Sequence, residues 1–141
     1  MPRDTLLNML EHIKDVQEPD LFFWTGDNSA HNVWSNTNEE VTEYTLQITS
    51  AIQYTFGDDD IIVYPIQGNH DTWPVNVEDF STPNSNFPIN HFKDSWVQWL
   101  GQDAIDKFGE YGYYSVPFKL PGGKVLENSK IIGFNSQTAN V

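Results

Sequence analysis

Two apolar runs that each end in a glycine-led polar motif constrain this chain more than any other feature. The first run, LFFWT at 21–25, leads directly into GDNSAH at 26–31. The second run, IIVYPIQ at 61–67, leads directly into GNHD at 68–71. Runs of β-branched and aromatic residues that stop at glycine are typical of buried strands that end in tight turns. Both motifs are therefore expected where strands leave a sheet, which is where open α/β sheets bind their ligands.

The segment between the two motifs predicts a crossover helix. Residues 37–40 fit a capping box, and apolar residues follow at helical spacing from Val41 to Thr55. A strand, a helix and a second strand in this order form a βαβ unit with parallel strands. A further amphipathic helix with an apolar face from Leu6 to Val16 precedes the first strand. The sequence thus predicts an α/β fold with both motif loops at one edge of a parallel sheet.

The second half of the chain predicts a loop, one more helix and further strands. Residues 71–90 are rich in Pro, Asn and Ser and indicate a long surface loop, which in a compact domain is usually functional or mobile. One helix should follow, with a buried face formed by Phe92, Trp96, Trp99, Leu100, Ile105 and Phe108. Residues 113–120 and 124 onward suggest a β-hairpin around Pro-Gly-Gly, and residues 130–135 suggest another core strand.

The polar residues of the motifs are suited to metal chemistry. The Asp27 carboxylate can bridge two cations, Asn69 offers a neutral carbonyl oxygen, and the imidazoles of His31 and His70 can bind metal or transfer protons. Each has an ordinary structural alternative, since Asp27 could be a helix cap or turn residue and Asn69 a turn residue. The occurrence of both motifs at matching strand ends favours a two-metal hydrolase.

At this point the sequence resembles a known family. GD followed by GNH(D/E) resembles the calcineurin-like metallophosphoesterases, and the strings WTGDNSAHNVW and VYPIQGNHDTWPVN are similar to the acid sphingomyelinase branch. The resemblance extends from residue 4 to residue 136 but covers only the first half or so of a family catalytic domain. It implies a partial four-layer sandwich in which residues 1–141 form an incomplete calcineurin-like phosphoesterase domain. The first metal motif, Asp-x-His, and the C-terminal His motifs of the family are missing.

The resemblance also implies a role for each motif residue. Asp27 and Asn69 match metal ligands, with Asp27 bridging two divalent ions, which the family and the mixed ligand set indicate to be zinc. His70 matches a residue near the phosphate that stabilises negative charge or aids proton transfer, and His31 points toward the same phosphate. Asp71 either orients the His70 ring or is an ordinary turn aspartate.

Two classes of function remain open from the sequence. The first is a phosphodiesterase that cleaves sphingomyelin, at a membrane surface, to ceramide and phosphocholine, or that cleaves nucleotide diesters or polyphosphate. WPVN at 73–76 is similar to the sphingomyelinases, whereas Asp71 in place of Glu is similar to the nucleotide-cleaving relatives. The second is a non-catalytic cation-binding or interaction module, which the missing motifs favour. The isolated chain is expected to be an inactive fragment.

The charge and the amino-acid composition exclude some binding partners and some kinds of metal site. The net charge of −13, from seven Lys and Arg against 20 Asp and Glu, argues against a nucleic-acid backbone as a partner. The absence of cysteine excludes disulfides and thiolate zinc sites. Neither a membrane-spanning stretch nor a signal peptide is visible, so a secreted or lysosomal location is implied by the resemblance alone. Of the tryptophans near the motifs, Trp24 is expected in the core, while Trp34 and Trp73 could line a lipid or base pocket.

Overall fold

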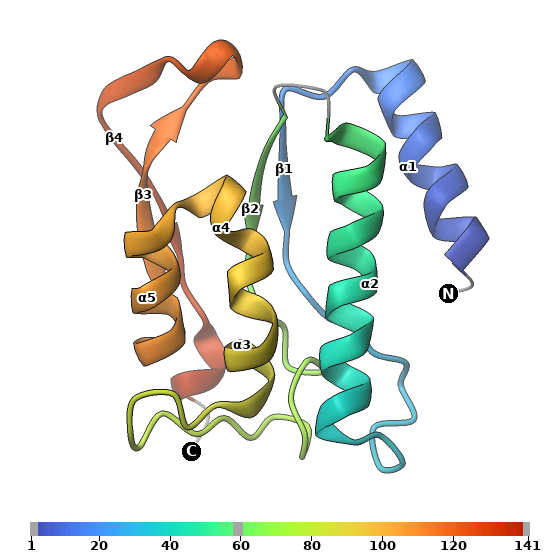
Figure 1. Cartoon of the computed structure of the whole chain (residues 1–141), viewed down its shortest axis with the longest axis vertical. Helices are drawn as coiled ribbons and strands as arrows, with labels where there is room; N and C mark the ends of the chain where they lie inside the picture. The colour runs from blue at the N-terminus through green and yellow to red at the C-terminus, as the bar shows by residue number, and fades with distance from the viewer. Residues whose placement is uncertain (1–2, 58–60, 140–141) are drawn as a thin grey trace.

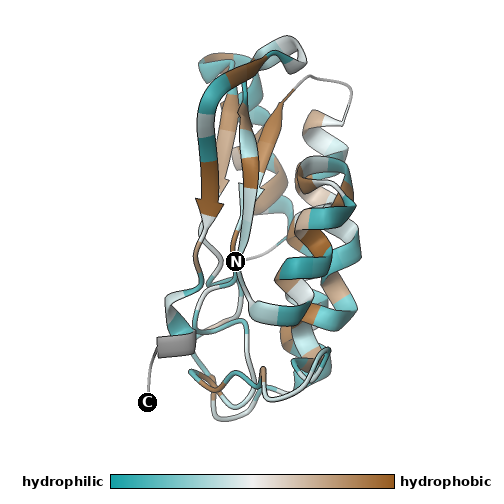
Figure 2. Cartoon of the chain, turned by 90° about the vertical axis from the view of Figure 1, so that its left-hand side faces the viewer, coloured by the Kyte–Doolittle hydropathy of each residue, from teal (hydrophilic) through white to brown (hydrophobic). Residues whose placement is uncertain are grey.

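Strands and helices lie in two layers, with the strands on one side and the helices on the other (Figure 2). The computed structural model describes residues 3–57 and 61–139. The helices are α1 (Arg3–Gln17), α2 (Asn38–Phe56), α3 (Phe87–Phe92), α4 (Val97–Leu100) and α5 (Gln102–Tyr111). The strands are β1 (Leu21–Trp24), β2 (Ile62–Pro65), β3 (Tyr114–Lys119) and β4 (Val125–Gly133). Short 3-10 turns occur at η1 (Lys93–Trp96), η2 (Pro121–Gly123) and η3 (Ser136–Ala139).

The expected βαβ unit is present and confirms the α/β class. β1 pairs in parallel with β2, with Leu21 opposite Ile62, and α2 is the crossover helix between them. The capping box at the start of α2 is formed as predicted, because the Thr37 hydroxyl accepts from the Glu40 amide and the Glu40 carboxylate accepts from the Thr37 amide. The loops that follow β1, β2 and β4 all lie at the lower end of the molecule in Figure 1.

The sequence predicted one continuous helix in this part of the chain, which is wrong because the structure has several shorter helices. The segment begins earlier than expected, at Phe87, because the Asn86 side chain accepts a hydrogen bond from the Ile89 amide and caps α3. It then continues through η1 and α4 and breaks at Gly101, whose φ of 80° and ψ of 160° are incompatible with a helix. The apolar spacing continues in α5 on the far side of this glycine, which is why the sequence suggested a single helix.

The predicted hairpin is present, but the separate core strand at 130–135 is wrong. Residues 130–133 continue β4, which pairs antiparallel with β3 and places Gly133 opposite Tyr114. Ile132 is 67% exposed, and Phe134, just beyond the strand, is also exposed. Ile131 packs against the hydrophobic core and Gly133 is buried, so residues 130–133 continue the hairpin with one face on the core and the other exposed.

Two hydrophobic clusters hold the helices against the strands. The first lies between α3–α5 and the strands and includes Ile89, Phe92, Trp96, Ile105, Phe108 and Tyr114. The second lies between α1, α2 and β2 and includes Leu10, Ala51, Ile52, Phe56 and Val63. Trp24 packs against both clusters, as expected for a core residue. Val16 is exposed, so the buried face of α1 is shorter than predicted.

Tyrosine hydroxyls join the hairpin to the parallel pair. Tyr114 donates from its hydroxyl to the Pro65 carbonyl at 2.8 Å, and the Lys119 amide donates to the Tyr64 hydroxyl at 3.2 Å. Within the described ranges, β1 and β2 form one two-stranded sheet and β3 and β4 form another. No helix in the described part of the chain is long and apolar enough to cross a membrane.

Candidate active site

The two motif loops are joined by hydrogen bonds from the backbone amides of one loop to the carboxylate side chains of the other. The His70 amide donates to the Asp27 carboxylate at 3.1 Å, which joins the end of β1 to the end of β2. Gly26 has a φ of 77° and Asp27 a φ of 60°, so the chain turns sharply as it leaves β1. A Cβ atom at Gly26 would collide with the Gly68 nitrogen and the Asp71 carboxylate. The glycines of both motifs therefore permit a close approach that a side chain would prevent.

Asp71 clamps the two loops together. Its carboxylate accepts hydrogen bonds from the backbone amides of Asp27 at 2.8 Å, Asn28 at 2.7 Å and Gly68 at 2.9 Å. The side chain is only 1% exposed. The sequence offered two roles for Asp71, orientation of the His70 ring or an ordinary turn. The hydrogen bonds that its carboxylate accepts add a contact that the sequence did not predict, because they join both motifs.

Opposing effects act on the pKa of Asp71. Burial raises the pKa of its carboxyl group, and the bonds from the three amides partly offset this increase. The negative charge of Asp27 raises the pKa further. Asp71 thus places a buried carboxylate behind the exposed carboxylate of Asp27, and the amides between them are what make this arrangement tolerable.

The two candidate catalytic histidines lie side by side. The ring centroids of His31 and His70 are 4.9 Å apart, with an angle of 53° between the ring planes. His31 is exposed and His70 is half-buried, so both imidazoles remain within reach of a ligand. The structure therefore brings together two histidines that are 39 positions apart in the sequence.

The Asn69 side chain is held in one orientation by Asn76. The Asn69 Nδ2 atom donates to Asn76 Oδ1 at 2.9 Å, and the Asn76 amide donates to the Asn69 carbonyl at 3.1 Å. Because the nitrogen end of the Asn69 amide is engaged, its Oδ1 atom is the end left to face a cation. Sequence reasoning missed Asn76, although its place in the WPVN string was noted.

Asn28 fixes the first motif to α2 and was also missed. Its Oδ1 accepts from the Trp24 indole at 2.9 Å, and its Nδ2 donates to the Thr45 hydroxyl at 3.1 Å.

Trp34 is 82% exposed, and Trp73 is also exposed, so neither packs in the core. Both remain available as surface aromatic groups on the loops that carry His31 and His70.

A third strand end reaches the same side of the molecule. Asn135, two residues after β4, donates from Nδ2 to both carboxylate oxygens of Glu78 at 2.7 and 2.9 Å. Burial raises the pKa of Glu78, the bond from Asn135 lowers it, and repulsion from Asp71 raises it again. A polar residue after an apolar run was a signal for Asn135 in the sequence, whereas no pattern indicated Glu78.

Two of the described residues carry oxygen atoms suited to a divalent cation. Asp27 offers a carboxylate and Asn69 an oriented carbonyl oxygen, both hard ligands suited to divalent cations. In residues 3–57 and 61–139, no three His, Cys, Asp or Glu side chains gather as a group able to hold a metal. The two residues therefore fit as two ligands of a larger set.

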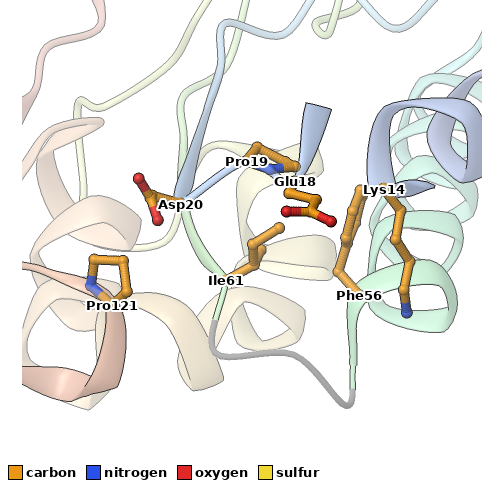
Figure 3. A pocket seen from close by; sticks show the side chains of 7 residues that line it. All are labelled: Lys14, Glu18, Pro19, Asp20, Phe56, Ile61 and Pro121. Carbon is orange, nitrogen blue, oxygen red and sulfur yellow. The ribbon is translucent and has the colours of Figure 1, made fainter. Parts of the chain in front are cut away.

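The site borders one groove and is remote from another pocket. A groove of about 680 Å³ runs between α1, α2 and β1 and ends at Asp27 and Ser29. A second pocket, of about 270 Å³, is lined by Lys14, Asp20 and Ile61, among others (Figure 3). Asp20 and Ile61 directly precede β1 and β2, so this pocket lies at the opposite end of the strands from both motifs.

Comparisons with known proteins agree with the motifs. Residues 2–139 match the family model described as Calcineurin-like phosphoesterase. Sphingomyelin phosphodiesterase A of Dictyostelium discoideum is 31% identical over 96% of this chain and 23% of its own length. Sphingomyelin phosphodiesterase of Homo sapiens is 28% identical over 89% of this chain and 20% of its own length. Cyclic GMP-AMP phosphodiesterase SMPDL3A of Bos taurus is 32% identical over 81% of this chain and 25% of its own length.

The chain therefore spans a quarter or less of the length of these relatives. The family match, in contrast, covers nearly all of the chain and includes both motifs. The fold agrees with it, because a parallel strand pair joined by a helix presents both motifs at one edge. The chain belongs to the calcineurin-like phosphoesterase family.

Proposed function

We propose that this chain carries part of the active site of a metal-dependent phosphodiesterase. The observation that supports this most directly is the convergence of both motifs: the His70 amide bonds to Asp27, and the rings of His31 and His70 lie 4.9 Å apart. An exposed carboxylate, an oriented amide oxygen and two adjacent imidazoles form a set suited to a phosphate ester and its counter-cations.

Asp27 and Asn69 would hold the metal ions in this proposal. Two divalent ions, which we propose to be zinc, would supply a water of lowered pKa and positive charge beside the phosphate oxygens. Asp27 would bridge them through its carboxylate, while Asn69 would bind one of them through Oδ1. The further ligands would come from residues outside this chain, since a zinc ion takes about four ligands.

His70 and His31 would act on the substrate. An imidazole beside the phosphate can donate a hydrogen bond to a developing negative charge or pass a proton to the leaving oxygen. The bond from the His70 amide to Asp27 fixes the backbone from which this imidazole projects. Asp71 would act indirectly, by holding both loops through their amides.

The proposed substrate is a phosphodiester, with sphingomyelin at a membrane surface as the first candidate. Relatives named sphingomyelin phosphodiesterase support this choice at 31% and 28% identity. A relative named cyclic GMP-AMP phosphodiesterase, at 32% identity, supports a nucleotide diester as the alternative. Parallel assays with sphingomyelin vesicles and with cyclic GMP-AMP would separate the two substrates, and polyphosphate is a third substrate to include.

We further propose that residues 1–141 are one part of a larger phosphoesterase domain. The groove between α1, α2 and β1 is lined in part by Met9 and Phe23, which are both exposed. A further segment of the domain would cover these apolar side chains. A secreted or lysosomal location would match the resemblance to the acid sphingomyelinase branch.

The experiment that tests the function is Asp27→Asn in a full-length protein that contains this chain. Loss of the bridging carboxylate charge should abolish metal-dependent diester hydrolysis and lower the bound metal content. Asn69→Ala should weaken one metal site and reduce the rate without unfolding the protein. The matched control is Asp103→Asn, an exposed carboxylate on α5 far along the chain from both motifs. Normal turnover and metal content in Asp27→Asn would remove Asp27 from the site.

A second test follows from the proposal that this chain supplies only two of the metal ligands, Asp27 and Asn69. The purified 141-residue chain should hydrolyse neither sphingomyelin nor bis-nitrophenyl phosphate, even with added zinc, because two ligands do not hold two catalytic ions. Metal analysis separates this reading from a non-catalytic module: two tightly bound ions in the full-length protein support the enzyme, whereas one ion or none supports the module. Zinc-dependent turnover by the chain itself, lost in Asp27→Ala, would contradict the proposed division of ligands.

A further inference from the structure

Glu78 and Asn135 form a largely buried polar contact that lies outside both motifs. They lie 57 positions apart, and the contact joins the loop after β2 to the chain just beyond β4. Asn135 is 2% exposed, and its Nδ2 donates to both oxygens of Glu78. Its Oδ1 accepts from the Gln137 amide at 3.0 Å, so the amide is oriented with its nitrogen toward Glu78.

This contact is close in sequence to the turn that holds Asn69. Asn76 makes two hydrogen bonds to Asn69, one to its side chain and one to its carbonyl, and Glu78 follows two residues later. Asn76 itself has a φ of 63°, a left-handed conformation that asparagine tolerates better than most residues. The Val77 amide donates to the Pro74 carbonyl and closes the same turn. The position of the turn at 74–77 therefore decides where the Asn69 side chain points.

We propose that Glu78 and Asn135 are positioning residues that anchor this turn to the end of β4 and thereby aim the Oδ1 atom of Asn69. The anchoring itself depends only on the contacts described here, while its use in metal binding rests on the proposed function. Such support is common around metal sites, where the groups that hold a ligand influence the affinity for the ion.

The chemistry of the contact favours an anchor over an incidental surface bond. A carboxylate removed from water lowers the stability of a protein unless a donor compensates for it. Burial raises the pKa of Glu78, and the charge of the neighbouring Asp71 adds to this effect. A carboxylate that served only to keep the loop soluble would be exposed, as that of Asp79 is, whereas Glu78 is partly buried.

Amide hydrogen exchange on a full-length protein that contains this chain tests the anchor. Asn135→Ala and Glu78→Ala should each lower the protection of the Asn76 amide about tenfold, which is the effect of losing one buried hydrogen bond. The internal reference is the Ile66 amide, which donates to the Trp24 carbonyl between β1 and β2 and should not change. The control variant is Glu127→Gln, an exposed glutamate on β4 that should leave both amides unchanged.

Conservative variants separate positioning from general stability. Glu78→Gln keeps one of the two oxygens that accept from Asn135 and should retain most of the protection of Asn76 that Glu78→Ala loses. Asn135→Asp keeps the shape but places a carboxylate against Glu78, so it should lose protection at neutral pH and regain it in acid. These variants decide the outcome even if an alanine variant does not fold.

Three results would overturn the proposal: unchanged protection of Asn76 in Asn135→Asp, an equal loss at Asn76 and Ile66, or a loss in Glu78→Gln as large as in Glu78→Ala. A zinc titration of the full-length protein then tests the link to function. Weaker zinc binding in Asn135→Asp, with normal binding in Glu78→Gln, supports positioning of Asn69. Altered exchange with unaltered zinc binding would leave the anchor in place and remove Asn69 from the metal site.

Discussion

The carboxylate of Asp71 accepts a hydrogen bond from the backbone amide of Asn28, 43 residues earlier in the chain, at 2.7 Å. The same carboxylate also bonds to the amides of Asp27 and Gly68. The distance between the two motif loops is thus set by the Asp71 side chain and three backbone amides. The side chains of His31 and His70 take no part in these bonds and stay available to a substrate. Four predictions follow from this arrangement and its surroundings.

Asp71→Asn should lower the free energy of unfolding by about 1–3 kcal/mol. Its amide retains one accepting oxygen, but its NH2 group would face a backbone N–H and leave that donor unsatisfied. Urea denaturation of the variant and the parent chain measures the difference. Asp15→Asn, which changes an exposed carboxylate on α1, should alter stability by less than about 0.5 kcal/mol. Equal effects of the two substitutions would argue against the clamp.

Gly26→Ala should destabilise the fold more than Gly122→Ala, although both glycines have a positive φ, of 77° and 76°. A Cβ at Gly26 would meet Gly68 and Asp71, whereas a Cβ at Gly122 has open space. We expect a loss of about 2–4 kcal/mol at Gly26 and about 1 kcal/mol at Gly122. Chemical denaturation of both variants separates the collision from the backbone strain that they share.

Glu78→Gln should become more stable relative to the parent as the pH rises. Burial raises the pKa of Glu78 in the folded state, so the folded state binds its proton more tightly than the unfolded chain does. The contribution of Glu78 to stability is therefore lost as the pH rises through the folded pKa. Melting temperatures of the two proteins at about pH 4 and pH 7 should nearly agree in acid and diverge at neutral pH. A constant difference would contradict the burial of this carboxylate.

His70→Ala should reduce diester hydrolysis by a full-length protein about a hundredfold or more, with the bound metal nearly unchanged. The reason is that the imidazole would act on the transition state without holding an ion. His31→Ala should have a similar effect, and His12→Ala, on the exposed side of α1, should have none. Steady-state rates and metal analysis on the same samples provide the comparison. Loss of an ion in His70→Ala would instead make His70 a ligand.

The sequence predicted the parts of this fold that depend on local pattern. Two parallel strands that end shortly before Gly26 and Gly68, joined by a helix with a capping box at Thr37, require both motifs to share one edge of a sheet. The break at Gly101 was missed because the apolar spacing is continuous across it, and one backbone conformation outweighed that pattern.

Contacts between distant residues were beyond prediction from pattern alone. The role of Asp71 depends on three amides that carry no sequence signal, because every residue except proline has one. Glu78 meets Asn135 across 57 positions, and neither periodicity nor motif links the two. The sequence therefore indicated which residues gather at the site, while the supports that hold them became visible only in three dimensions.

The tyrosine hydroxyls that connect the hairpin to β2 have a consequence for cooperativity. Tyr114 and Tyr64 each supply one hydrogen bond between the two sheets, where a continuous sheet would have a backbone ladder. With so few hydrogen bonds at this junction, the β3–β4 hairpin is held to the rest of the fold mainly by its buried side chains Tyr114 and Val116, so a loss of that packing would detach it as a unit. Because the hairpin leads into Asn135, its detachment would release the Glu78 loop at the same time. The order of the edge that carries both motifs would then depend on a hairpin that itself contains none of the motif residues.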